Sequence, residues 1–248
     1  MKRRQADVPL PALDAVADEK TAFFMTASHQ LKSPLAIIQW CLQSALEDTD
    51  LKPATRTMLA RAVAQSSGMS HLLTDMLQTL RIVHDQGVAR DLVPVDVNAV
   101  IHAVIEQYRP VANQVGVHLV KGAIEDLPPI LGDEQYLTQA FINLVDNAIK
   151  YTSEHGRVEV TACVRKGFVE FQVHDTGIGI ADADQGRLFT EFFRSESAKE
   201  KAREGTGLGL VLVKHIIESF KGTVTFKSAV HKGTTFTVHL PVSASKGR

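Results

Sequence analysis

The sequence predicts an α+β protein: a helical hairpin that pairs with a second copy in a dimeric four-helix bundle, followed by an α/β sandwich. Three observations predict it. Apolar or small residues recur at alternating steps of three and four through the first third of the 248 residues, which is the heptad pattern of packed helices. A stretch of turn-forming residues then breaks this pattern. Beyond the break, helical patterns mix with the alternating patterns of strands, which indicates helices packed on a mostly antiparallel sheet.

Two heptad seams define the predicted hairpin. The first runs from Phe24 to Ala45 and the second from Leu59 to Val83. The loop between them ends at Pro53, which suits the first turn of a helix. A hairpin alone buries only one apolar stripe of each helix. We therefore expect a second copy of the chain to cover the apolar surface that remains. The alternative is that the second domain covers this stripe within a monomer.

The predicted domains are residues 10–88 for the hairpin and 94–242 for the sandwich. Glycine, aspartate and proline interrupt the helical pattern between them, so residues 85–97 are predicted to form a linker. Within the second domain we expect helices at 98–114, 134–151 and 208–220, and strands at 117–121, 157–165, 168–174, 223–228 and 234–240.

The composition excludes several classes of protein. Lys and Arg number 27 against 28 Asp and Glu, for a net charge of −1, which argues against strong nonspecific nucleic-acid binding. Two cysteines are too few for a disulfide scaffold. No apolar run reaches the roughly 18 residues that cross a bilayer, and the basic start has no hydrophobic region behind it, as a signal peptide would. We therefore expect a soluble protein of a reducing compartment, with no membrane segment in this chain.

One side of the predicted helix at 134–151 is polar. At 100° per residue, Asn143, Asn147, Lys150 and Tyr151 fall within an arc of about 100°, and the opposite side is apolar. Carboxamide oxygens can ligate a Mg²⁺ ion that already carries phosphate charge, and a lysine can neutralise phosphate oxygens. The alternative interpretation is an ordinary solvated helix face.

Two glycine-rich elements follow along the chain. Asp175-Thr176-Gly177-Ile178-Gly179 comes directly after a predicted strand. An aspartate there can accept a hydrogen bond from an exocyclic amine, and the glycines let the backbone pass close to a ring. Gly205-Thr206-Gly207-Leu208-Gly209 opens a predicted helix, whose free N–H groups can hold phosphate.

The segment between these elements is polar apart from one aromatic cluster, which runs from Phe189 to Arg194. Its tail, residues 195–204, contains only small or charged residues. This composition is typical of a mobile flap anchored by aromatic side chains. The alternative is a disordered surface loop, which we expect to hold in part for 195–204 without nucleotide.

These motifs, in this order, resemble the catalytic and ATP-binding domain of sensor histidine kinases, a branch of the superfamily that includes gyrase, Hsp90 and MutL. The resemblance implies that ATP and Mg²⁺ are bound. It assigns Asp175 to the adenine amino group, Asn147 with Asn143 to Mg²⁺, and Lys150 and Tyr151 to the phosphates.

The resemblance extends to the flap. Glycines 205, 207 and 209 would form the hinge and the phosphate wall, and Arg194 would lie near the transferred γ-phosphate. In the ATP-hydrolysing relatives, a glutamate that activates water stands where this chain has Asn143. A carboxamide cannot act as a general base, so phosphoryl transfer is favoured over hydrolysis.

A second resemblance concerns the first domain. The segment from Ser28 to Leu35, which contains His29, Gln30 and Pro34, is similar to the phosphoacceptor box of histidine kinases. His29 follows a seam position and so lies on the flank of the bundle, and a neutral imidazole is a competent nucleophile. The family usually has an acid at the position of Gln30. Glutamine can orient the ring but cannot take a full proton, so we expect slower transfer and weak phosphatase activity.

The two resemblances together cover roughly residues 10–242. They imply a cytoplasmic two-component histidine kinase, which autophosphorylates His29 and passes the phosphoryl group to an aspartate of a response-regulator receiver domain. About ten residues precede the first predicted helix, too few for an input domain, so we expect either a piece of a larger, membrane-anchored kinase or signals that arrive through a partner. A nucleotide-responsive binding scaffold, suggested by Gln30, and a gyrase-type ATP hydrolase are the alternatives.

Overall fold

The computed structural model describes residues 31–84, 92–202 and 205–243. Its contacts divide the chain into two compact units between His84 and Asp85. The predicted phosphoacceptor His29 and its neighbour Gln30 lie outside the described residues.

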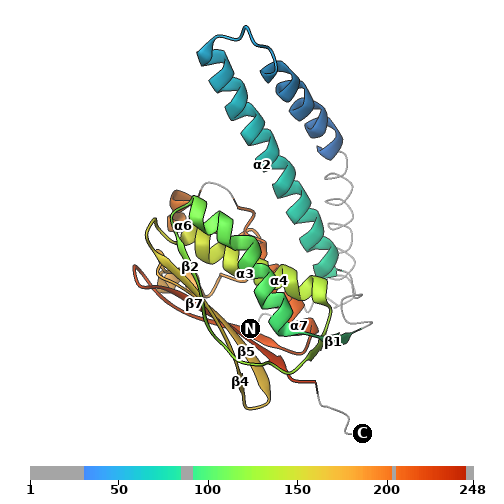
Figure 1. The fold of residues 1–248 in the computed structure, drawn as a ribbon, viewed down its shortest axis with the longest axis vertical. Coiled ribbons are helices and arrows are strands. Elements are labelled where there is room, and N and C mark those ends of the chain that lie inside the picture. The colour runs from blue at the N-terminus through green and yellow to red at the C-terminus, as the bar shows by residue number, and fades with distance from the viewer. Residues whose placement is uncertain (1–30, 85–91, 203–204, 244–248) are drawn as a thin grey trace, which may run out of the picture. The chain divides into compact units, whose positions relative to one another are not determined.

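The first unit is a helical hairpin, as the heptad seams predict (Figure 1). A helix at residues 31–46 is followed by α2, Pro53–His84, which begins at the predicted proline. Arg56 holds the connecting loop because its guanidinium donates to the carbonyls of Leu46 at 3.3 Å and Asp48 at 2.8 Å. Farther along, Nε2 of Gln39 donates to Oγ of Ser67 at 2.9 Å and so joins the two helices.

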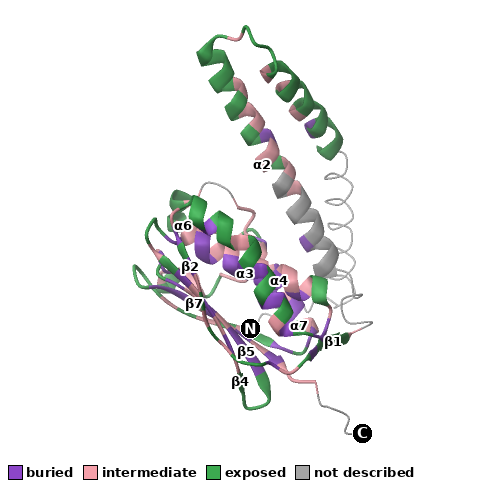
Figure 2. Cartoon of the chain, viewed as in Figure 1, coloured by how far each residue is buried: buried purple, intermediate pink, exposed green. Residues whose placement is uncertain are grey.

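A single hairpin leaves much of the predicted seam uncovered. Leu35 is buried, but the seam residues Leu31 and Ile38 are 54% and 52% exposed, and Met69 is exposed on α2. The upper part of the hairpin is accordingly mostly exposed in Figure 2. One chain by itself therefore leaves apolar surface open along the stripe that a second copy is predicted to cover.

The second unit is a five-stranded sheet with three helices on one face (Figure 1). The strands are β2 (His118–Ile124), β4 (Arg157–Arg165), β5 (Phe168–Asp175), β6 (Thr223–Ala229) and β7 (Gly233–Pro241), in the order β2-β4-β5-β7-β6. The helices are α3 (Val97–Gln114), α4 (Glu134–Tyr151) and α7 (Gly209–Ser219). Only the β2–β4 pair is parallel in this sheet. The predicted helices and strands of this unit, and the α+β class, are confirmed.

The core of the second unit lies between the helices and the sheet. Alternate residues of β5 are buried there, and the ring of Phe171 stacks on Phe141 of α4 with 3.8 Å between centroids. Asp133 starts α4, since its side chain accepts from the N–H groups of Gln135 and Tyr136. Because its apolar side packs on the sheet, α4 carries its polar side away from it.

The predicted linker at 85–97 is wrong from Val93 onward. Residues 93–95 form β1 (Val93–Val95), which pairs antiparallel with β3 (Ile130–Gly132). Asp96 then caps α3, which begins at Val97. Residues 85–91 lie outside the described residues. The glycine, aspartate and proline residues of this segment suggested a linker, but a strand of three residues is specified by its distant partner. A proline is also tolerated in a two-stranded ribbon.

The flap contains two short helices, α5 (Asp182–Gln185) and α6 (Glu196–Lys201). Within the tail at 195–204, for which partial disorder without nucleotide is expected, residues 196–201 form α6. Oγ of Ser195 accepts from the N–H of Ala198 and caps this helix, and Lys199 pairs with Glu196 at 2.6 Å. Serine followed by glutamate and alanine is a helix-start signal that the overall polarity obscured. Residues 203–204 lie outside the described residues.

No helix within the ranges 31–84, 92–202 and 205–243 has the length and apolar character that a membrane span requires.

Candidate nucleotide site

The polar side of α4 meets the start of α7. Nδ2 of Asn143 donates to the carbonyl of Gln139 at 2.8 Å, which fixes the carboxamide. A Cβ atom at position 209 would lie 2.6 Å from Oδ1 of Asn143 and 3.9 Å from Nδ2 of Asn147. Glycine at 209 therefore allows α7 to begin directly against the two carboxamides. The structure brings together Asn143, Asn147 and Gly209, which were predicted from two separate motifs.

Two cations converge on Gly205. Nζ of Lys150 and Cζ of Arg194 would each lie 3.4 Å from a Cβ atom at this position. Nη1 of Arg194 donates to the carbonyl of Gly205 at 3.2 Å, and Nη2 donates to the carbonyls of Ala198, at 3.2 Å, and Ala202. Arg194 thus braces the segment around α6 with its guanidinium, while Lys150 reaches the same backbone from α4.

The remaining residues of this glycine element fix the backbone that leads into α7. Oγ1 of Thr206 accepts from the N–H of Leu208 at 3.2 Å, and the Leu208 side chain is buried in the core. Gly207 has a φ of +72°, and a Cβ there would lie 2.7 Å from the main chain of Phe192. No side chain caps the start of α7 at Leu208, so the first turn of this helix offers N–H groups to an anion.

Aromatic side chains anchor the flap, as the sequence predicts. The ring of Phe189 lies 6.1 Å from that of Phe226 on β6, which in turn lies 5.9 Å from Phe236 on β7. The guanidinium of Arg187 stacks over the ring of Phe193 at 4.3 Å. The aromatic part of the flap is therefore attached to the second unit's sheet.

Asp175 ends β5 with its side chain only 5% exposed. Its Oδ1 atom accepts from the main-chain N–H groups of Gly177 at 2.8 Å and Thr234 at 3.2 Å. Burial raises the pKa of the Asp175 carboxyl, and the two N–H donors offset part of this rise. Among the residues that the structure describes, no donor is bound to Oδ2, which leaves this oxygen as the acceptor for a ligand.

The loop after Asp175 is tied to the end of α4. The N–H of Ile178 donates to the carbonyl of Tyr151 at 3.2 Å, and a Cβ at Gly177 would lie 2.5 Å from the same oxygen. Gly179, with φ +66°, packs against the carbonyl of Ala229. Both glycines are needed where the sequence predicts close passage of the backbone. The Tyr151 side chain is half-buried on the polar side of α4.

Two segments of the chain match models of known protein families. Residues 132–244 match the family model described as histidine kinase-, DNA gyrase B-, and HSP90-like ATPase. Residues 19–84 match the His Kinase A (phospho-acceptor) domain. The chain belongs to the histidine kinase family. The family and the order of its two domain types, both predicted from the motifs, are confirmed.

Relatives of this histidine kinase chain include the sensor-like histidine kinase SenX3 of Mycolicibacterium smegmatis, which is 33% identical over 88% of this chain and 56% of its own length. The sensor histidine kinase RppB of Synechocystis is 31% identical over 90% and 49%. The chain thus spans about half the length of the curated relatives it matches.

Two solved structures share the architecture. Full-length ShkA in complex with AMPPNP has a TM-score of 0.71 and 29% identity, over 93% of this chain and 47% of that one. The histidine kinase AdeS of Acinetobacter baumannii has a TM-score of 0.61 and 26% identity, over 87% and 98%.

Sequence reasoning missed several residues around the nucleotide site of this histidine kinase chain. Gln139 orients Asn143, and Thr234 binds Asp175 from the neighbouring strand. Asp146, next to Asn147, is half-buried, and the desolvation of its carboxyl raises its pKa despite the charge of Lys150. The helical spacing of four could have indicated Gln139. The contact of Thr234 depends on the β5–β7 register, which a single sequence does not contain.

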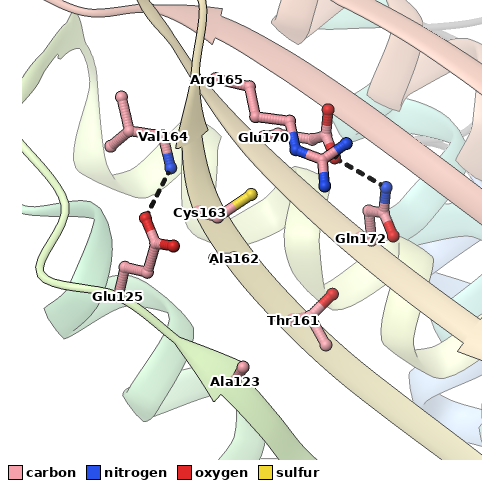
Figure 3. Close-up of a pocket in the computed structure, with 9 residues that line it drawn as sticks. All are labelled: Ala123, Glu125, Thr161, Ala162, Cys163, Val164, Arg165, Glu170 and Gln172. Atoms are coloured by element: carbon pink, nitrogen blue, oxygen red, sulfur yellow. Dashed lines mark hydrogen bonds and ion pairs between the residues drawn. The ribbon is translucent and has the colours of Figure 1, made fainter.

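The opposite face of the sheet holds a polar hollow of about 300 Å³, which Figure 3 shows with its lining residues. At its floor the carboxylate of Glu170 accepts from Gln172 at 2.9 Å and lies 3.2 Å from His239 and 3.8 Å from Arg165. Asp175 lies five residues on in β5, so its side chain points to the other face. The hollow is therefore separate from the nucleotide site.

Within the described ranges, no three His, Cys, Asp or Glu side chains cluster to hold a metal ion.

Proposed function

We propose that this chain binds Mg-ATP, transfers the γ-phosphoryl group to His29, and then passes it to an aspartate of a response-regulator receiver domain. The observation that carries the proposal is the convergence at the start of α7. There two carboxamides, of Asn143 and Asn147, lie beside Gly209, and two cations, Lys150 and Arg194, lie beside Gly205. Carboxamides, cations and free helix N–H groups are the donor set that a nucleotide triphosphate with its metal requires.

The adenine ring would lie at the end of β5. Oδ1 of Asp175 is fixed by two main-chain N–H groups, so Oδ2 is held in one direction, where it would accept from the exocyclic amino group. A fixed, buried acceptor discriminates strongly against a base that has no donor at that point. Gly177 and Gly179 would leave room for the ring.

The phosphates would lie between α4 and α7. Lys150, the Tyr151 hydroxyl, the N–H groups from Thr206 to Gly209 and the guanidinium of Arg194 would contact their oxygens. Asn143 and Asn147 would hold Mg²⁺, because neutral oxygen ligands suit an ion whose charge the phosphates already balance. When bound, the ion would neutralise charge on the phosphate oxygens.

In the transfer step, a ring nitrogen of His29 forms a bond to the γ-phosphorus while the bond from phosphorus to the bridging oxygen breaks. ADP leaves with that electron pair. Lys150 and Arg194 stabilise the charge, and Gln30 orients the ring by hydrogen bonding without taking its proton, which leaves the other ring nitrogen for solvent water. The receiver carboxylate then attacks the phosphohistidine, and His29 is regenerated. The protein contributes mainly positioning and charge neutralisation.

The exposed apolar residues of the hairpin support two proposed partners. A second copy would cover the open seam at Leu31, Ile38 and Met69 in a homodimer. Ile37 and Trp40 lie outside that seam and are 64% and 67% exposed, so they would offer apolar contacts to a receiver domain. The kinase would act in the cytoplasm, where response regulators are found.

The test is incubation with γ-labelled ATP and Mg²⁺, followed by mapping of the modified residue. We expect acid-labile, base-stable label on His29, and we expect His29→Ala to abolish labelling while ATP still binds. Label that survives this substitution would assign the acceptor to another residue. Rapid phosphate release with no phosphoenzyme would favour a hydrolase. Nucleotide binding with neither outcome would favour the scaffold that Gln30 suggests.

A further inference from the structure

Ser228 on β6 lies where the loop after Asp175 meets the start of β7. Its hydroxyl accepts from the main-chain N–H of Ile180 at 2.9 Å and donates to the carbonyl of Gly233 at 3.1 Å. The hydroxyl of Thr234 lies 2.9 Å away. A serine hydroxyl has one donor and two acceptor positions. With Thr234 as donor, all three are used, one by the loop after Asp175 and two by Gly233 and Thr234 at the start of β7.

The same loop and turn also hold Asp175. Its Oδ1 atom accepts from Gly177 of the loop and from Thr234 after the turn. In the strand register, Ser228 pairs with Thr234, and Thr234 pairs with Asp175. The three residues form one row across β6, β7 and β5, so the hydroxyl and the carboxylate join the same two segments from the strands on either side of β7.

The loop and the turn are in direct main-chain contact. The N–H of His231 donates to the carbonyl of Ile178 at 2.8 Å, and a Cβ at Gly233 would overlap the carbonyl of Asp175. Nε2 of Gln185 bridges them again, at 3.2 Å from the carbonyl of Ile180 and 3.4 Å from that of Ser228. A small displacement of the loop from the turn would therefore move the donors on Oδ1 of Asp175.

We propose that Ser228 is a positioning residue for the nucleobase: its hydroxyl holds the loop at 176–180 against the turn at 229–233 and thereby aims Oδ2 of Asp175 at the adenine amino group. The inference rests on the base contact in the proposed function. Without the hydroxyl, the N–H of Ile180 and the hydroxyl of Thr234 lose their acceptor, and a polar group left without a partner favours rearrangement toward water.

The test compares binding of ATP with binding of the purine riboside triphosphate that lacks the 6-amino group. The wild type should prefer ATP by roughly tenfold or more, the value of a hydrogen bond to a charged acceptor. In Ser228→Ala this preference should fall below about threefold. The matched control is Thr235→Ala, which removes a 2.9 Å bond to Nδ1 of His174 on the other face of the sheet and should keep the wild-type preference.

Labelling of His29 at saturating ATP should be unchanged in Ser228→Ala, so that the KM for ATP rises and kcat does not. Should Ser228→Ala discriminate between the two nucleotides as the wild type does, the positioning role is wrong and the proposed function stands. A wild type that does not discriminate would overturn the base contact and this inference together. If the alanine variant does not fold, Ser228→Thr should keep the preference and Ser228→Cys should lose it. Equal preferences in those two would also overturn the inference.

Discussion

Thr234 donates its main-chain N–H to Oδ1 of Asp175 at 3.2 Å, across the ladder in which β5 and β7 pair these two residues. The contact holds a nearly buried carboxylate in one orientation. The two carboxylate oxygens differ as a result: Oδ1 accepts from two main-chain N–H groups, whereas among the described residues no donor is bound to Oδ2.

Asp175→Asn should therefore separate binding from stability. Asparagine can keep Oδ1 on its two N–H donors but would turn an N–H₂ group toward the adenine amino group. We expect ATP affinity to fall by roughly a hundredfold or more, because two donors would face each other in a buried site. Titration calorimetry at neutral pH measures this loss.

The stability of the same variant should be unchanged or higher at neutral pH. Burial raises the pKa of Asp175 in the folded state, so the folded chain binds this proton more tightly than the unfolded chain. The protonated carboxyl therefore makes its full contribution to the free energy of unfolding at a pH below its ordinary pKa. This contribution is lost as the pH rises through the raised pKa of the folded state. The melting temperature of the variant minus that of the wild type should increase over that window and then level off. A variant less stable than the wild type at pH 7 would contradict this.

Gly209→Ala should weaken nucleotide binding by steric overlap alone. The added Cβ would lie 2.6 Å from Oδ1 of Asn143, so α7 would have to move away from α4. Displacements of this size cost roughly ten- to a hundredfold in well-positioned sites. Both the dissociation constant of Mg-ATP and the rate of His29 labelling should show the loss.

The control for this prediction is Gly186→Ala. A Cβ at position 186 meets nothing within 4 Å, and the backbone there has a φ of −66°, so binding and labelling should stay at the wild-type level. Equal behaviour of the two variants would mean that the close approach of α7 to Asn143 has no role in holding the nucleotide.

Arg194 should have two separable effects. Arg194→Ala removes the bonds to the carbonyls of Ala198, Ala202 and Gly205, so amides of α6 should exchange with deuterium roughly tenfold faster. Labelling should also slow, because a cation is lost from the phosphate region. Arg194→Lys keeps the charge but cannot reach three acceptors, so it should restore part of the labelling and little of the protection. Restoration of both by lysine would contradict the bracing role.

The parts of the site that a sequence can predict are those set by local geometry. The shared arc of Asn143, Asn147 and Lys150 follows from the pitch of one helix. The contacts of Thr234 and Ser228 cannot be predicted in this way. Thr234 and Asp175 are 59 residues apart in the sequence, and the strand register that brings them together is not specified by any local pattern. The pairing of β1 with β3 was hidden for the same reason. The helix α6 was missed because its charged composition outweighed the capping serine.

Trp40→Ala should slow transfer to the receiver domain while leaving autophosphorylation within about twofold of the wild type. The indole is 67% exposed outside the predicted seam, and an exposed tryptophan is a typical anchor in protein interfaces. Truncation should reduce the transfer rate from purified phosphohistidine chain by roughly tenfold or more. Met58→Ala is the matched control, because Met58 is 72% exposed on α2 and its removal should leave both rates unchanged. Equal slowing of both reactions by Trp40→Ala would instead indicate that the indole supports the hairpin or its dimer, which sedimentation of the variant would reveal as a shift toward monomer.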